Sequence, residues 1–299
     1  MSAAGAGRVR VVGLGPGGMA GMTAQAVEAL RECDVIAGYT GYVALLSDLV
    51  ADKPILSTPM RHEVERCRLA LERAAAGADV AMVCSGDAGV YGMAGLVLEL
   101  APDFPGVTVE VIPGVTAAQS GAALLGAPLG HDFATVSLSD ALTSWDVIER
   151  RLRAAAEADF CLALYNPRSN HRPDHLRCAV AALLGAGKPV DTVCGWARNV
   201  GRDGQETGTC TLGELTELDA DMFTTVFVGN ADTRLIEGRM VTPRGYRGVG
   251  TGEVAGAGGG DVRGAGTPER GRGAEEGEAG AHDVGAPALG RQAEMEGER

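Results

Sequence analysis

The chain has 299 residues, 45% of them hydrophobic, and a formal net charge of −13. A chain of this length buries one large core or two modest ones, and we expect two lobes. The acidic balance argues against a nucleic-acid partner, whose phosphates attract a basic surface. Its apolar runs are far shorter than the roughly 20 residues that span a bilayer, and no secretory signal is readable. We therefore expect a cytoplasmic protein without a membrane partner.

The first part of the chain alternates short β-branched runs with helical patterns, which is typical of an α/β fold with a mostly parallel sheet. A helix is predicted from Glu63 to Ala76, where apolar residues recur at helical spacing. Strands are predicted at Val9–Gly13, Val35–Ala37, Pro54–Leu56, Val80–Cys84 and Val107–Ile112.

The pattern restarts after Pro113, which marks the predicted boundary between the lobes. A helix is predicted from Trp145 to Ala156, with Ser144 as its cap and an ion pair from Glu149 to Arg153. Strands are predicted at Phe133–Leu138, Phe160–Leu164, Val190–Cys194 and Thr224–Val228. The predicted organisation is an N-terminal α/β lobe at 8–114, a C-terminal α/β lobe at 115–247 and a disordered tail rich in Gly and Glu at 248–299.

The cysteines do not suggest a metal site. All seven are scattered singly, and no spacing among them is typical of zinc ligands. We therefore expect buried free thiols and no metal.

A glycine-rich loop, GLGPGG at 13–18, follows the first predicted strand and matches the dinucleotide-binding pattern G-x-G-x-x-G. In that motif the helix N-terminus faces the pyrophosphate. Here Thr23 is the predicted N-cap, so the helix begins beyond the loop, and the second predicted strand ends without the acid that holds a ribose hydroxyl. A dinucleotide-dependent oxidoreductase stays an alternative that rests on Gly13, Gly15 and Gly18 alone.

The same loop resembles the G-x-G-P-G signature that opens the tetrapyrrole methylase family, and later stretches resemble further segments of that family in order. These are SGDAGVYGMAG at 85–95, IPGVTAAQ at 112–119, LYNPRS at 164–169 and VGN at 228–230. HDFA at 131–134, SLSD at 137–140 and GRMVTPRGY at 238–246 resemble its ring-contracting precorrin-3B branch. The resemblance covers about residues 8–247.

The resemblance implies a two-lobed fold, each lobe a mostly parallel sheet flanked by helices, with a cleft between the lobes. It implies a homodimeric methyltransferase of cobalamin (vitamin B12) biosynthesis that uses S-adenosyl-L-methionine. The tetrapyrrole substrate would be precorrin-3B or its cobalt form, methylated at carbon 17 with ring contraction to precorrin-4. Two alternatives stay open within this resemblance: another precorrin methyltransferase, and a tetrapyrrole carrier without turnover.

The resemblance also implies where the cofactor binds, because the matching segments follow predicted strands, where α/β folds bind ligands. The implied cofactor-binding residues are Ser85, Gly86, Asp87, Thr116, Ala117, Asn166, Gly229 and Asn230.

Ring contraction needs a general acid or base in addition to the alignment that methyl transfer requires. The candidate catalytic residues are His131, Asp132, Asp140 and Tyr91. A second interpretation stays open for each: an exposed loop histidine for His131, turn capping for the two aspartates and ring packing for Tyr91.

A precorrin carries acetate and propionate groups, which arginine recognises through paired hydrogen bonds. Arg168 and Arg172 are the first candidates for these contacts, with Arg61, Arg198 and Arg202 as second choices. The loop residues Gly13, Gly15, Pro16 and Gly17 are expected to line the tetrapyrrole side of the cleft.

Overall fold

The first half of the chain forms a sheet in which every strand pair is parallel. The computed structural model describes residues 6–46 and 50–246. The strand order is β3-β2-β4-β1-β5. Its central strands are mostly apolar because helices bury both faces of the sheet, and the charged exceptions are Arg8 and Arg10 in β1 and Asp79 in β4. The strands are β1 (Arg8–Gly13), β2 (Val35–Tyr39), β3 (Ile55–Thr58), β4 (Asp79–Cys84) and β5 (Thr108–Ile112), each overlapping a predicted strand.

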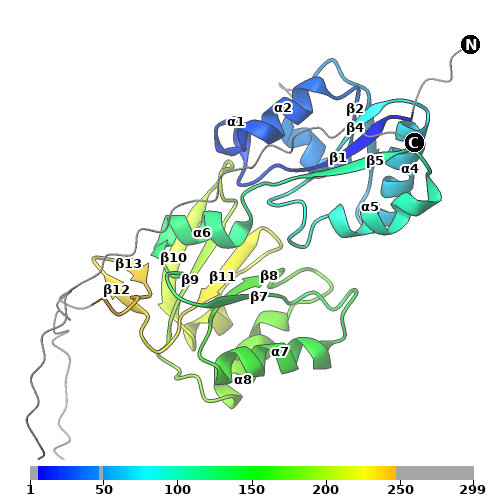
Figure 1. The fold of residues 1–299 in the computed structure, drawn as a ribbon. Coiled ribbons are helices and arrows are strands. Elements are labelled where there is room, and N and C mark those ends of the chain that lie inside the picture. The colour runs from blue at the N-terminus through cyan, green and yellow to red at the C-terminus, as the bar shows by residue number, and fades with distance from the viewer. Residues whose placement is uncertain (1–5, 47–49, 247–299) are drawn as a thin grey trace, which may run out of the picture. The chain divides into compact units, whose positions relative to one another are not determined.

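Helices cover the two faces of this first sheet (Figure 1). On one face, α2 (Ala24–Glu32) packs Leu30 against the strands. On the other face lie α4 (Glu63–Ala75), which buries Leu71 as its apolar periodicity predicts, and α5 (Ala94–Leu100). The shorter elements are α3 (Thr40–Val43), η1 (Ala44–Leu46) and η2 (Ala101–Asp103).

The glycine-rich loop leads into a one-turn helix, α1 (Gly18–Gly21), which the sequence pattern did not predict. The longer helix α2 begins at Ala24, and the Thr23 side chain accepts a hydrogen bond from the Ala26 N–H at 3.1 Å. The predicted N-cap at Thr23 is therefore confirmed. Strand β2 ends at Tyr39 without an acidic residue.

The second sheet corrects the prediction of a mostly parallel arrangement in both lobes. Its order is β10-β9-β11-β8-β7, and within it β7–β8 is the parallel pair while the other three pairings are antiparallel. The reason is that residues 199–205 join β9 to β10 as a hairpin, without the crossover that a parallel connection needs. The strands are β7 (Phe133–Ser137), β8 (Cys161–Tyr165), β9 (Val193–Arg198), β10 (Glu206–Thr211) and β11 (Thr224–Val228).

Helices also cover the second sheet on both faces. On one face lie α7 (Trp145–Glu157) and α8 (His175–Gly185), and on the other α6 (Ala117–Leu125) packs against Phe227. The predicted Glu149–Arg153 pair forms at 2.6 Å, whereas the Ser144 side chain makes no capping hydrogen bond. The remaining elements are η3 (Glu214–Glu217) and a small sheet of β6 (Gly126–Ala127), β12 (Arg234–Ile236) and β13 (Arg239–Val241).

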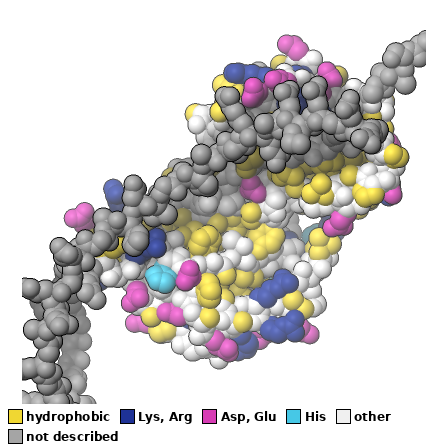
Figure 2. Space-filling model, viewed as in Figure 1, with side chains coloured by type: hydrophobic (Ala, Val, Ile, Leu, Met, Phe, Trp, Pro, Cys, Tyr) yellow, Lys and Arg dark blue, Asp and Glu magenta, His cyan; other side chains and the backbone are white. Residues whose placement is uncertain are grey.

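Both sheets belong to one compact unit of the chain, so the proposed domain boundary at residue 114 stays a prediction. The predicted tail lies outside the described residues. Within the described ranges, no helix is long and apolar enough to cross a membrane. Acidic and basic side chains are interspersed on the face shown in Figure 2.

Three loops meet backbone to backbone at the carboxyl edge of the first sheet. The Gly15 N–H donates to the Gly86 carbonyl at 2.8 Å, and the Val115 N–H donates to the Gly15 carbonyl at 3.3 Å. A Cβ atom on Gly15 would lie 2.0 Å from the Val115 carbonyl oxygen, and one on Gly114 would lie 2.2 Å from the Gly86 carbonyl oxygen. Glycine is therefore required here by close backbone approach.

Replacing Gly15 by alanine is expected to destabilise the fold by roughly 1–3 kcal/mol or more, because the new methyl group forces the three loops apart. Gly95→Ala is the matched control, since a Cβ atom there meets nothing within 4 Å. It should leave stability unchanged or raise it by up to about 1 kcal/mol. Thermal unfolding of both variants checks this, and equal melting temperatures for Gly15→Ala and the wild type would contradict it.

Candidate functional site

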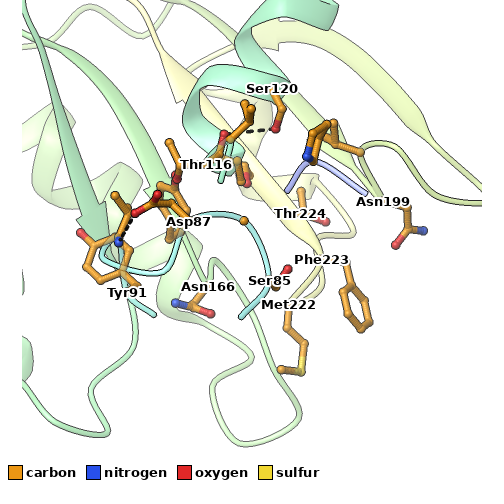
Figure 3. A pocket seen from close by; sticks show the side chains of 18 of the residues that line it. Ser85, Asp87, Tyr91, Thr116, Ser120, Asn166, Asn199, Met222, Phe223 and Thr224 are labelled. Carbon is orange, nitrogen blue, oxygen red and sulfur yellow. Dashed lines mark hydrogen bonds between the residues drawn. The ribbon is translucent and has the colours of Figure 1, made fainter. Parts of the chain in front are cut away.

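A pocket lies where strand ends of the two sheets meet (Figure 3). The first sheet contributes the loops that follow β1, β4 and β5. The second sheet contributes the loops that follow β8 and β9 and the segment that enters β11.

The loop after β4 is shaped by Asp87. Its Oδ1 accepts hydrogen bonds from the N–H groups of Gly89 at 2.8 Å and Val90 at 3.0 Å. Its Oδ2 accepts one from the Gly114 N–H at 3.0 Å, which ties this loop to the loop after β5. Both carboxylate oxygens are thus bonded to backbone, and the side chain holds the pocket wall in shape.

The N-terminus of α6 forms the next part of the wall, and a residue of the second sheet holds it. The Tyr165 hydroxyl accepts a hydrogen bond from the Ala118 N–H at 2.7 Å and lies 2.6 Å from the Thr116 Oγ1. Burial raises the pKa of Tyr165, against the two hydrogen bonds from Thr116 and Ala118, which lower it. The phenol therefore stays protonated at neutral pH and serves as a polar anchor for the helix.

Three pocket residues that are not glycine adopt left-handed backbone conformations. Tyr91 has φ of 54°, Asn166 of 53° and Asn199 of 50°. Asparagine tolerates this region, whereas tyrosine rarely adopts it. Such conformations cluster at functional sites because the surrounding structure has to hold them in place. Here the Asn166 side chain donates to the Ser137 Oγ at 3.0 Å, and the Tyr91 ring packs on Tyr165 with centroids 5.1 Å apart.

The structure brings most of the predicted cofactor residues together. Gly229 and Asn230 lie instead at the opposite edge of the second sheet, because β11 runs antiparallel to β8 and its carboxyl end points away from the pocket. There the Lys188 Nζ donates to the Gly229 carbonyl at 2.9 Å, and the Asn230 Oδ1 accepts from the Thr233 hydroxyl at 3.0 Å. The predicted cofactor residues that do line the pocket are Ser85, Gly86, Asp87, Thr116, Ala117 and Asn166.

The predicted catalytic residues divide between the two edges of the second sheet. Tyr91 lines the pocket. His131 and Asp132 precede β7 and lie beside the start of β8, since the Asp132 carbonyl accepts from the Cys161 N–H. The five-residue strand β7 places them about 15 Å from the pocket edge, at roughly 3.3 Å per residue.

Asp140 follows β7 and so lies at the same edge of the sheet as the pocket, although it does not line it. Its Oδ2 is 3.6 Å from the His175 Nε2, and its Oδ1 is 3.8 Å from the Arg172 Nη1. The His175 Nδ1 lies 2.7 Å from the Leu138 carbonyl oxygen, which fixes the proton on Nδ1 and leaves Nε2 facing the carboxylate. The His175 ring packs on Trp145, with centroids 4.9 Å apart.

The predicted substrate residues are also divided. Of the glycine-rich loop, Pro16 lines the pocket, whereas Gly13 and Gly15 belong to the backbone junction and Gly17 contacts the β9–β10 turn. Arg168 is half-buried and pairs with Asp219 at 2.9 Å. Arg172 donates to the Ser139 Oγ at 2.5 Å beside Asp140.

The segment from Met222 to Thr225 and the turn carrying Asn199 and Arg202 line the pocket without having been predicted as cofactor-binding. These residues lie at the pocket because a hairpin reverses the direction of the chain after β9. A signal for that hairpin exists in the sequence, because Thr207, Thr209 and Thr211 alternate as in a strand after the glycines of the turn.

Among the described residues, no group of three or more His, Cys, Asp or Glu side chains is placed to hold a metal ion. The cysteines in that part of the chain are free thiols, and most of them are buried.

Comparison with known proteins assigns the chain to a family. A Salmonella typhimurium protein named probable cobalt-factor III C(17)-methyltransferase is 48% identical over 79% of this chain and 98% of its own length. The crystal structure of the methyltransferase CobJ matches with a TM-score of 0.75 and 39% identity, covering 79% of this chain and all of that one.

The uroporphyrin-III C-methyl transferase from Thermus thermophilus, solved in complex with S-adenyl homocysteine, matches with a TM-score of 0.59 and 25% identity. The match covers 75% of this chain and 97% of that chain. Residues 8–216 also match the family model described as Tetrapyrrole (Corrin/Porphyrin) Methylases. The chain therefore belongs to the tetrapyrrole (corrin/porphyrin) methylases.

Proposed function

We propose that the chain methylates carbon 17 of precorrin-3B or its cobalt form with S-adenosylmethionine, in cobalamin biosynthesis and with ring contraction to precorrin-4. The observation that carries this proposal is the pocket, where family-like segments from distant parts of the chain converge. The identity of 48% to a probable cobalt-factor III C(17)-methyltransferase supports carbon 17 as the position that is methylated. Family membership makes the chain a methyltransferase.

The pocket residues fit S-adenosylmethionine as cofactor. Ser85, Asp87, Thr116 and Asn166 provide polar groups, and Met222 and Phe223 provide apolar surface, as a cofactor with an amino acid and an adenosine requires. The bound cofactor supplies an electrophilic methyl group with a good leaving group. The loops of the pocket align the reacting carbon with it and exclude water.

The acid–base work of ring contraction has two candidate positions near the pocket. Tyr91 lines it directly, and Asp140 with His175 lies at the same sheet edge, joined to the pocket through Asn166 and Ser137. Arg172, in contact with Ser139 and Asp140, is the candidate at this edge for binding a carboxylate of the macrocycle.

The alternative of a dinucleotide-dependent oxidoreductase loses its support, because Gly13 and Gly15 are explained by backbone packing. The homodimer and the cytoplasmic location that were expected from the sequence stay predictions.

The purified protein, supplied with S-adenosylmethionine and either precorrin-3B or its cobalt form, is expected to produce a macrocycle carrying one additional methyl group. Mass spectrometry of the product identifies which form is used, and NMR of the product locates the methyl group. Binding of NAD without binding of S-adenosylhomocysteine, measured by calorimetry, would contradict the proposal.

Asp87→Ala is expected to weaken S-adenosylhomocysteine binding at least about tenfold, because the loop loses three hydrogen bonds to a charged acceptor. Asp87→Asn should also weaken it, since its amide N–H₂ cannot accept from the Gly114 N–H as Oδ2 does. The matched control is Asp103→Ala, which removes an exposed carboxylate paired with Arg68 at the surface. Calorimetry checks the affinities, and an unchanged affinity in Asp87→Ala would refute this role of the loop.

A further inference from the structure

Arg202 crosses the pocket from one sheet to the other. It lies in the β9–β10 turn of the second sheet, and its Nη2 donates to the Oγ of Ser85, in the loop after β4, at 2.8 Å. Its guanidinium carbon lies 5.9 Å from the centroid of the Phe223 ring. Among the described residues that line the pocket, Arg202 is the one arginine or lysine.

Among the described residues, no acidic side chain forms an ion pair with Arg202. Within the described part of the chain no carboxylate lies within 4.0 Å of it, and its buried Nε has no hydrogen-bond partner. Arg198, at the end of β9, instead contacts Glu206 at 3.5 Å and Asp221 at 3.7 Å. Burial lowers the pKa of Arg202, as expected for a cation withdrawn from water without a counter-ion. Such burial is costly unless an anion completes the site.

The turn holds this arginine in place before any ligand arrives. The Arg202 N–H donates to the Asn199 carbonyl at 2.9 Å, and the Gly201 N–H donates to the Gln205 Oε1 at 2.8 Å. The turn also packs on the glycine-rich loop, where a Cβ atom on Gly17 would lie 2.7 Å from the Gly201 carbonyl oxygen. A guanidinium held in this way binds an anion with little further loss of entropy.

We propose that Arg202, together with Ser85, forms a carboxylate-binding subsite of the pocket. This inference rests on the proposed function, which offers two sources of a carboxylate: the amino-acid end of the cofactor, and an acetate or propionate of the macrocycle. The negative charge of Asp87 is taken up by hydrogen bonds from backbone N–H groups to both of its oxygens. Arg202 is the residue of the described pocket lining whose positive charge can attract an anionic ligand. The planar guanidinium donates to Ser85 through Nη2, and its buried Nε–H has no hydrogen-bond partner.

The test compares Arg202→Gln with the wild type and with Arg151→Gln, which removes the same charge from an exposed position on α7. Calorimetry measures the affinity for S-adenosylhomocysteine and for methylthioadenosine, which lacks the amino-acid carboxylate. Steady-state kinetics measures the KM for the macrocycle. A loss of roughly 10- to 100-fold is expected for the ligand whose carboxylate binds, and none for Arg151→Gln.

A loss for S-adenosylhomocysteine without a loss for methylthioadenosine identifies the cofactor carboxylate, and a rise in the macrocycle KM alone identifies the substrate. Equal losses for both nucleosides, or no change in affinity and KM, would overturn the subsite. If Arg202→Gln does not fold, phenylglyoxal labelling of the wild type replaces it: protection of Arg202 by either carboxylate ligand supports the subsite, and protection by neither overturns it. A wild type that neither binds S-adenosylhomocysteine nor methylates a macrocycle would instead refute the proposed function.

Discussion

The backbone contact between three loops at the carboxyl edge of the first sheet is the constraint on which the pocket depends. Gly15 bonds to Gly86 on one side and to Val115 on the other, at distances that leave no room for a side chain. The Asp87 carboxylate closes the arrangement by accepting the Gly114 N–H. These contacts join the ends of β1, β4 and β5, so the three loops that form the pocket wall hold one another in place.

The glycines that suggest a nucleotide-binding loop therefore have a different physical role. In a dinucleotide fold the glycines bring backbone close to a pyrophosphate, whereas Gly13 and Gly15 bring backbone close to backbone. The same residue type serves both purposes because it lacks a Cβ atom. Two features distinguish the cases: the longer helix α2 begins only at Ala24, after the one-turn helix α1, and strand β2 ends at Tyr39 without an acidic residue.

The second sheet contributes to the pocket through the direction of its strands. The hairpin between β9 and β10 places β11 antiparallel to its neighbours, so the start of β11 and the end of β8 share an edge. Met222 to Thr225 thereby line the pocket, and Gly229 and Asn230 are carried to the far side. Strands β7 and β8 are parallel, so Asp140 and His175, which follow them, lie at the edge of the sheet that carries the pocket. His131 and Asp132 precede β7 and therefore lie at the opposite edge.

The sequence alone determined the α/β class, the strands of the first sheet, the Thr23 cap and the family-like loops, because these depend on local periodicity, capping and contiguous motifs. Only the tertiary structure decided which strand ends share an edge, since strand direction depends on connections and pairing between distant residues. That is why Ser85, Asp87, Thr116 and Asn166 were predicted together while Met222 was missed. It is also why Arg202 stands out only in the structure. The sequence shows that residue 202 carries a positive charge, but only the fold shows that no described carboxylate lies within 4.0 Å of it.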